Sequence, residues 1–181
     1  MLGTGTRLPI PTYHLAPTLG AASQCSREQS NAIAAILTPA DVFLGLEAAT
    51  KERAFEHIAR FIALRHGLSA ASVQASLVER ERIGSTGLGF GIAIPHARIK
   101  GLSRPIATFV RTKIPLAFGA PDDKPVSDML VLLVPQEVTD AHLQLLATAA
   151  QMFSDRGFRE NLRGSADPAA VHSAFAGALG R

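Results

Sequence analysis

Cysteine and aromatic residues are scarce in this sequence. Cys25 is the only cysteine among 181 residues, which excludes an intrachain disulfide and a thiolate-rich metal site. Aromatic residues amount to 6%, and they do not alternate with basic residues as a base-stacking surface for single-stranded nucleic acid requires. The sequence therefore indicates a protein of a reducing compartment, the cytoplasm, with no nucleic-acid partner.

Long apolar runs and blocks of one charge are missing as well. No run approaches the roughly 18 apolar residues that span a bilayer. Residues 1–29 lack the charged start and the apolar block of a signal peptide. The 18 basic residues are scattered and only slightly outnumber the 15 acidic ones, so the formal charge of +3 does not indicate a nucleic-acid surface. We expect no direct insertion into a membrane.

The length suits one domain with a single core behind an N-terminal extension. Residues 1–29 contain Pro9, Pro11 and Pro17 and no sustained helical or alternating pattern, so we expect a flexible extension there. Apolar residues recur with clear periods farther along the chain. We therefore assign the domain to residues 30–181.

The first half of the domain predicts a strand followed by two helices. The strand is expected at residues 42–46. Thr50 has the chemistry of an N-cap for an amphipathic helix that Gly67 ends. Ser69 begins a second helix, which ends near Gly84. This second helix leads directly into a glycine-rich segment.

The second half of the domain predicts a sheet covered by helices. Residues 106–111 alternate with a period of two, which indicates a half-buried strand. Residues 129–134 are apolar without alternation, which predicts a strand at the centre of the sheet, covered on both faces. Three helices are expected, at about residues 139–154, 158–162 and 167–179. Together these elements predict an α/β or α+β fold, a three-layer α/β/α sandwich with a mixed sheet.

The segment from Arg80 to His96 contains the residues with the most specific chemistry. It passes through small residues with free backbone N–H groups into an apolar Ile-Ala-Ile run, which places one imidazole at the end of a short strand. Pro95 precedes the histidine and restricts the local backbone. The combination of a fixed imidazole, an arginine and glycine N–H groups indicates a site that handles phosphate.

Two other kinds of site share features with this segment. Residues 87–91 look superficially like a nucleotide-binding loop, but such a loop leaves a strand and opens a helix, whereas this one leaves a helix and leads to a strand. His96 and His142 could hold zinc on one side of a sheet, but no His-x-x-x-His, paired cysteine or carboxylate at helical offset supports this. We therefore expect no metal.

A third alternative makes His96 a covalent phosphoryl acceptor. A neutral imidazole is a competent nucleophile, and the group that it receives needs hydrogen-bond donors nearby. Arg80 offers a guanidinium fork, and the hydroxyls of Ser85 and Thr86 are candidates for binding the phosphoryl group. Each charge-assisted hydrogen bond contributes about 1.5–3 kcal/mol, so two or three would hold an added charge of about −1.5 to −2.

The same residues match a known signature. The run Arg-Glu-x-x-Gly-Ser-Thr-Gly-x-Gly-x-Gly-Ile-Ala-Ile-Pro-His, from Arg80 to His96, closely resembles the active site of phosphotransferase-system (PTS) enzyme IIA domains of the fructose–mannitol class. The resemblance covers about residues 30–178. The Gly-Ser-Thr-Gly run and the continuation Pro-His-Ala-Arg-Ile-Lys-Gly-Leu are most like the nitrogen-regulatory members of that class.

This resemblance implies a phosphohistidine carrier rather than an enzyme that turns over a small-molecule substrate, and it implies no cofactor. His96 would receive its phosphoryl group from a phosphocarrier protein of the HPr type or its NPr-like counterpart. Arg80 would support that group, and His142 would lie beside the acceptor and position it. The fold of the family is a mixed sheet between helices.

Three functions are open at this point. The first is a cytoplasmic regulator of transporters, sensor kinases or enzymes linked to nitrogen or potassium, switched by phosphorylation of His96. The second is a sugar-transport IIA component that passes phosphate to a IIB domain. The third is a binding module that is never phosphorylated. Phe90 stands where relatives often have a polar residue, so it is expected either to shape the docking surface or to pack in the core.

Overall fold

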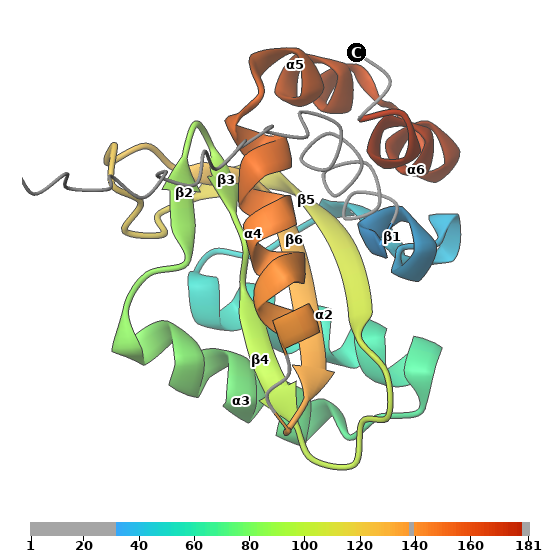
Figure 1. The fold of residues 1–181 in the computed structure, drawn as a ribbon. Helices are drawn as coiled ribbons and strands as arrows, with labels where there is room; N and C mark the ends of the chain where they lie inside the picture. Colours follow the sequence, from blue (N-terminus) through green and yellow to red (C-terminus); the bar gives the residue numbers. More distant parts are fainter. Residues whose placement is uncertain (1–31, 138–139, 179–181) are drawn as a thin grey trace, which may run out of the picture.

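The computed structural model describes residues 32–137 and 140–178 of the chain (Figure 1). The extension expected over residues 1–29 lies outside the described residues. A short helix at residues 32–36 precedes the named elements. These are, in chain order, η1 (Pro39–Asp41), β1 (Val42–Leu46), α2 (Lys51–His66), α3 (Ala70–Ile83), β2 (Gly87–Gly89), β3 (Ile92–Ala93), β4 (His96–Ile99), β5 (Ile106–Leu116), β6 (Val126–Pro135), α4 (Asp140–Ser154), α5 (Arg156–Gly164) and α6 (Pro168–Ala176).

The strands form one mixed sheet with β6 in its interior. The strand order is β1-β5-β6-β3-β2, and β4 also pairs with β6. β6 runs antiparallel to β5 and parallel to β3 and β4, while β1 lies parallel to β5. Every residue from Asp128 to Val134 is buried. The prediction of a central strand covered on both faces is therefore confirmed.

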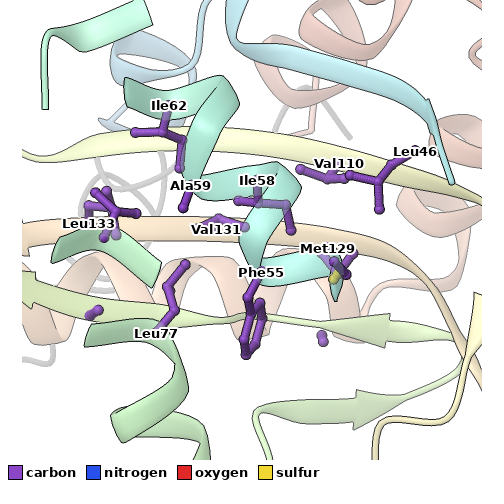
Figure 2. Packing of buried hydrophobic residues seen from close by; sticks show 14 of the residues in the cluster. Leu46, Phe55, Ile58, Ala59, Ile62, Leu77, Val110, Met129, Val131 and Leu133 are labelled. Carbon is purple, nitrogen blue, oxygen red and sulfur yellow. The ribbon is translucent and has the colours of Figure 1, made fainter. Parts of the chain in front are cut away.

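Helices cover both faces of this sheet. Met129, Val131 and Leu133 of β6 share a core cluster with residues of α2 and α3 (Figure 2). Leu130 and Leu132 point to the opposite face, because side chains alternate along a strand, and they pack in a second cluster with α4, α5 and α6. Figure 1 shows α4 in front of the sheet, running along β6. The predicted three-layer α/β/α sandwich with a mixed sheet is confirmed.

The strand predicted at residues 106–111 is present as the first part of β5, but the prediction that it is half-buried is wrong. Every residue from Ile106 to Val110 is buried. Ile106 and Val110 pack in the cluster of α2 and α3, whereas Ala107 and Phe109 pack in the cluster of α4, α5 and α6. β5 also lies between β1 and β6 rather than at the edge of the sheet. Helices on both faces and strands on both sides leave the first half of β5 without contact to solvent.

The two helices before the glycine-rich segment have the predicted ends. The Thr50 hydroxyl caps α2 by accepting a backbone N–H, and Gly67 ends α2 in the left-handed conformation, with φ +69°. Ser69 caps α3 in the same way as Thr50 caps α2. Because α3 begins and ends at these points, Arg80 lies in its last turn, and α3 packs beside β4.

The three C-terminal helices are present, and the middle one is longer than predicted. Asp155 accepts the backbone N–H of Phe158 and so begins α5 directly after α4. As a result α5 has nine residues and carries Arg156, Arg159 and Arg163, which line one hollow together.

Candidate functional site

His96 is the first residue of β4 and is held by the central strand. It lies opposite Leu132 of β6, and the backbone N–H of Leu132 donates to the carbonyl of Pro95 (2.9 Å). The histidine is half-buried. Because β6 is buried from Asp128 to Val134, the backbone of His96 is hydrogen-bonded to the centre of the core.

The hydrogen bonds of this ring define its tautomer. Nδ1 of His96 lies 2.9 Å from the carbonyl oxygen of Ile94. A carbonyl can only accept, so Nδ1 carries the proton of the neutral ring. Nε2 then holds the lone pair, and it accepts a hydrogen bond from Nε of Arg80 at 3.0 Å. Nε2 is therefore the nucleophilic nitrogen of this imidazole.

The surroundings of His96 favour the neutral ring. Burial is the largest cause that lowers the pKa of His96 below its ordinary value, and the positive charges of Arg80 and Arg98 lower it further. The hydrogen bond to Ile94 and the negative charge of Glu81 act in the opposite direction. The result is a ring whose lone pair is available at neutral pH, as a nucleophile requires.

We expect His96 to protonate at a lower pH than a histidine in an unfolded peptide, for which the pKa is about 6.5. An NMR titration of the ring protons measures this directly. Because the lowered pKa belongs to the folded state, the unfolded chain binds more protons in the window between the two pKa values. The contribution of His96 to stability is thus complete above pH 6.5 and falls as the pH drops through the folded pKa. A midpoint at or above the peptide value would contradict this prediction.

Arg80 reaches the imidazole from the last turn of α3. Its Nη1 donates to the carbonyl of Gly84 (3.0 Å), and its Nε donates to Nε2 of His96. Within the described part of the chain, Nη2 of Arg80 has no protein partner. The guanidinium is therefore anchored at one end and keeps N–H groups for an anion that arrives at Nε2 of His96.

Glu81 is a buried residue of the site that the sequence analysis did not single out. Its carboxylate accepts from Nζ of Lys51 (2.9 Å), and from the N–H (3.1 Å) and the hydroxyl (2.7 Å) of Thr86. It thereby ties α2, α3 and the glycine-rich segment together behind Arg80. Its position directly after Arg80 in the motif could have indicated a role in the site. A glutamate on a helix ordinarily faces solvent, however, so residue type alone does not predict its burial.

Ser85 and Thr86 lie near His96, but their hydroxyl groups are engaged elsewhere. The three residues line one small hollow of about 220 Å³. The Ser85 hydroxyl donates to the carbonyl of Phe118 (2.8 Å), and the Thr86 hydroxyl donates to Glu81. Binding of a phosphoryl group by these hydroxyls stays a prediction. To donate to a phosphoryl oxygen, each hydroxyl would have to give up its present hydrogen bond.

A larger hollow, of about 510 Å³, brings His96 and His142 together. His142 lies in the first turn of α4 and is 8% exposed. Ile83 and Leu143 line the same hollow and are 81% and 60% exposed, and Leu88 at the small hollow is 38% exposed. We call Ile83, Leu88 and Leu143 the apolar rim. The positioning role of His142 stays a prediction.

The chemistry offered here is nucleophilic attack by Nε2 of His96 on a centre whose negative charge Arg80 can hold. Within residues 32–137 and 140–178, no three side chains of His, Cys, Asp or Glu gather as a metal ion would require. In the same ranges, no helix combines the length and the apolar character needed to cross a bilayer.

The fold and the site together define an α/β/α domain in which a half-buried histidine presents the lone pair of Nε2 to an arginine. Residues 35–177 match the family described as "Phosphoenolpyruvate-dependent sugar phosphotransferase system, EIIA 2". The chain belongs to this family of PTS enzyme IIA domains.

Within the family, the chain is similar to nitrogen-regulatory proteins. It is 38% identical to the "Nitrogen regulatory protein" of Pseudomonas aeruginosa over 138 residues, which cover 76% of this chain and 90% of that one. The crystal structure of nitrogen regulatory protein IIA-Ntr from Neisseria meningitidis matches with a TM-score of 0.75 and 39% identity, over 80% of this chain and 99% of that one. IIA mannitol from Escherichia coli, at 23% identity and a TM-score of 0.62 over 75% and 96% of the two chains, agrees in fold. The resemblance to nitrogen-regulatory members is confirmed.

Proposed function

We propose that this chain is a cytoplasmic phosphocarrier and regulator that accepts a phosphoryl group on Nε2 of His96 from an HPr- or NPr-like protein. The observation that carries the proposal is the ring tautomer, with Nδ1 donating to Ile94 and the Nε2 lone pair facing Arg80. Family membership supports a phosphocarrier or regulatory role. The function requires no cofactor, because both the nucleophile and the phosphoryl donor are histidines.

The proposed transfer exchanges one P–N bond for another. The Nε2 lone pair of His96 attacks the phosphorus of a phosphohistidine on the carrier, and the bond from phosphorus to the carrier's ring breaks with its electron pair on that ring. The carrier's ring leaves as neutral imidazole when its other nitrogen is protonated. The Nδ1 proton of His96 stays in place, hydrogen-bonded to the carbonyl of Ile94.

Arg80 is proposed to change its hydrogen-bond acceptor during this transfer, from the imidazole to the incoming phosphoryl group. Its Nε–H donates to the Nε2 lone pair in the present structure, and it would donate to a phosphoryl oxygen once that lone pair is in the P–N bond. The anchor of Nη1 on the Gly84 carbonyl keeps the guanidinium beside the imidazole meanwhile. A guanidinium positioned in advance stabilises the transferring phosphoryl group without reorganisation.

Regulation is proposed to act through the apolar rim. Ile83, Leu88 and Leu143 are exposed around the two hollows that His96 lines, so a partner that covers them also covers the imidazole. Phosphorylation adds a charge of about −1.5 to −2 inside that contact, which disfavours partners that fit the neutral site. Transporters, sensor kinases and enzymes linked to nitrogen or potassium are the partner classes that we propose.

A second candidate function is phosphate relay in sugar uptake. The "PTS system fructose-specific EIIA component" of Haloferax volcanii is 39% identical to this chain over 87 residues, which cover 48% of this chain and 56% of that protein. In this alternative, phosphorylated His96 passes its group to a IIB domain. The two functions therefore differ in what removes the phosphoryl group.

The first test is intact-mass analysis after incubation with phosphoenolpyruvate, the first enzyme of the phosphotransferase chain and an HPr- or NPr-like carrier. We expect an acid-labile gain of one phosphoryl group, and NMR coupling between phosphorus and the ring nitrogens should place it on Nε2 of His96. Rapid loss of the label to an added IIB domain would favour the sugar relay. If neither carrier transfers phosphate, the chain is a binding module that is never phosphorylated.

A further inference from the structure

A hollow of about 460 Å³ is lined by residues of α5, of the turn that joins β2 to β3 and of the segment before β6. In Figure 1, α5 and the β2–β3 turn lie in the upper part of the molecule. We call it the cationic hollow, after the four cations that line it: Lys124, Arg156, Arg159 and Arg163. Among the described residues, Glu160 is the single carboxylate in its lining, and it pairs with Arg156 (2.7 Å). The residues that line it differ from those of both hollows beside His96, so it is a separate place on the protein.

Two of the arginines are held in position before any ligand arrives. Arg159 is 9% exposed, and its Nη1 donates to the carbonyls of Phe153 (2.7 Å) and Ser154 (2.8 Å) at the end of α4. Arg163 donates through Nη2 to the carbonyl of Phe90. Lys124, by contrast, donates no hydrogen bond through Nζ to the described residues, and its charge acts on Asp122, whose pKa is lowered mainly by the N–H of Phe90 and in part by Lys124. The cationic hollow therefore combines two guanidinium groups that are hydrogen-bonded to backbone carbonyls with the ammonium of Lys124.

Phe90 forms the wall of the cationic hollow opposite α5 and is held in an uncommon conformation. Its φ is +57°, in the left-handed region that non-glycine residues rarely adopt. Its N–H donates to Asp122 (2.8 Å), and its carbonyl accepts from Arg163, so both ends of the residue are fixed. The guanidinium of Arg159 lies 4.3 Å from the ring centroid, yet Phe90 is 54% exposed. Gly91 also has a positive φ, +79°, so the conformation of Phe90 belongs to the two-residue hairpin turn between β2 and β3, which leaves its ring at the surface.

We propose that the cationic hollow binds a nucleoside polyphosphate, with the phosphate chain among the four cations and the base stacked on the exposed side of the Phe90 ring. The hollow has the size of a small-molecule site, for which about 300–1,000 Å³ is typical. Arginine forks bind phosphate oxygens in pairs, and the excess of positive charge matches a polyphosphate. A nucleoside base explains why an exposed aromatic ring lies at this hollow. The Phe90 ring beside Arg159 offers a surface on which a base can stack, and an anion without a base does not need such a surface.

Isothermal titration of the full-length, unphosphorylated protein with ATP and with inorganic triphosphate tests this proposal. We expect ATP to bind about tenfold more tightly than triphosphate, because base stacking on an aromatic side chain contributes in that range. Phe90→Leu should remove this difference and leave the affinity for triphosphate unchanged. Leucine fills a similar space on the same backbone, so the variant tests the ring itself.

Charge variants separate a built site from general attraction to anions. Lys124→Gln combined with Arg163→Gln should weaken both ligands by at least about tenfold, since two charged donors are lost. Lys100→Gln combined with Arg104→Gln is the matched control, because it removes one lysine and one arginine at exposed positions away from α5. This control should bind ATP and triphosphate like the wild type.

Several results would overturn the assignment. The first is that the wild type does not bind ATP at millimolar concentration, and the second is that it binds ATP and triphosphate with equal affinity. The third is that the two double variants lose equal amounts of affinity. Tighter binding of a hexaglutamate peptide than of ATP would also overturn it and would assign the surface to an acidic protein segment. His96→Ala should bind ATP like the wild type, so failure here is distinguishable from failure of the phosphocarrier proposal.

Discussion

Replacing His96 with alanine should abolish phosphoryl uptake and leave the fold intact. The substitution removes Nε2, the lone pair that faces Arg80, and with it the nucleophile between the two hollows. The ring is half-buried, and the backbone of residue 96 keeps its place beside β6, so the free energy of unfolding should change by no more than about 1 kcal/mol. Intact mass after incubation with phosphoenolpyruvate and the carrier proteins should show no labelled species for this variant.

His57→Ala provides the matched control for this experiment. His57 is exposed on α2, on the other side of the sheet from α4. The control should take up phosphate at the wild-type rate, and thermal unfolding should show that both variants are folded. If His96→Ala is labelled like the control, the acceptor lies elsewhere and the proposed site is wrong. His142→Ala should be labelled more slowly but to completion, because a positioning residue changes the rate and not the acceptor.

Local sequence patterns predict the central strand of the sheet and the ends of the helices, because each of these features depends on residues that are close together in the sequence. The unbroken apolar run at residues 129–134 reflects a strand covered on both faces, and the Thr50 cap acts on the turn that follows it. The half-burial expected of residues 106–111 is wrong because an alternating pattern suggests one solvent-facing side without showing what covers that side. Thr108 is fully buried, and its hydroxyl has no hydrogen-bond partner among the residues that the structure describes. Its burial comes from β1, β6 and two helical layers, which no local window contains.

The candidate site likewise contains residues that the sequence predicts and groups that only the fold brings into place. The proximity of His96 and Arg80 could be predicted, because the order of residues between them matches the signature of the family, whereas their roles in phosphoryl transfer stay predictions. The groups that hold them are largely backbone carbonyls, of Ile94 and Gly84, whose positions depend on the fold and not on residue type. The cationic hollow could not be predicted either, because it forms only when α5 and the segment around Lys124 come together.

Replacing Glu81 with alanine should destabilise the protein by about 3 kcal/mol. Three donors lose a hydrogen bond: Nζ of Lys51, which keeps the carbonyl of Phe118 (3.2 Å), and the N–H and hydroxyl of Thr86. Thr86 is buried, so its donors do not regain water in the folded state. The Lys51 side chain is 23% exposed and recovers part of its hydration, which keeps the expected loss at the lower end of the range for a broken buried pair. Equilibrium unfolding in urea measures the change.

Glu79→Ala is the control, because Glu79 lies on the same helix but is exposed, and its removal should change stability by less than about 0.5 kcal/mol. The functional consequence of Glu81→Ala can also be separated from a change in protonation. The negative charge of Glu81 raises the pKa of His96, so its loss leaves the imidazole even more fully neutral at pH 7. Slower phosphoryl uptake by the variant would therefore arise from displacement of Arg80 and the glycine-rich segment. A free energy of unfolding equal to that of Glu79→Ala would mean that the Glu81 network does not hold this segment in place.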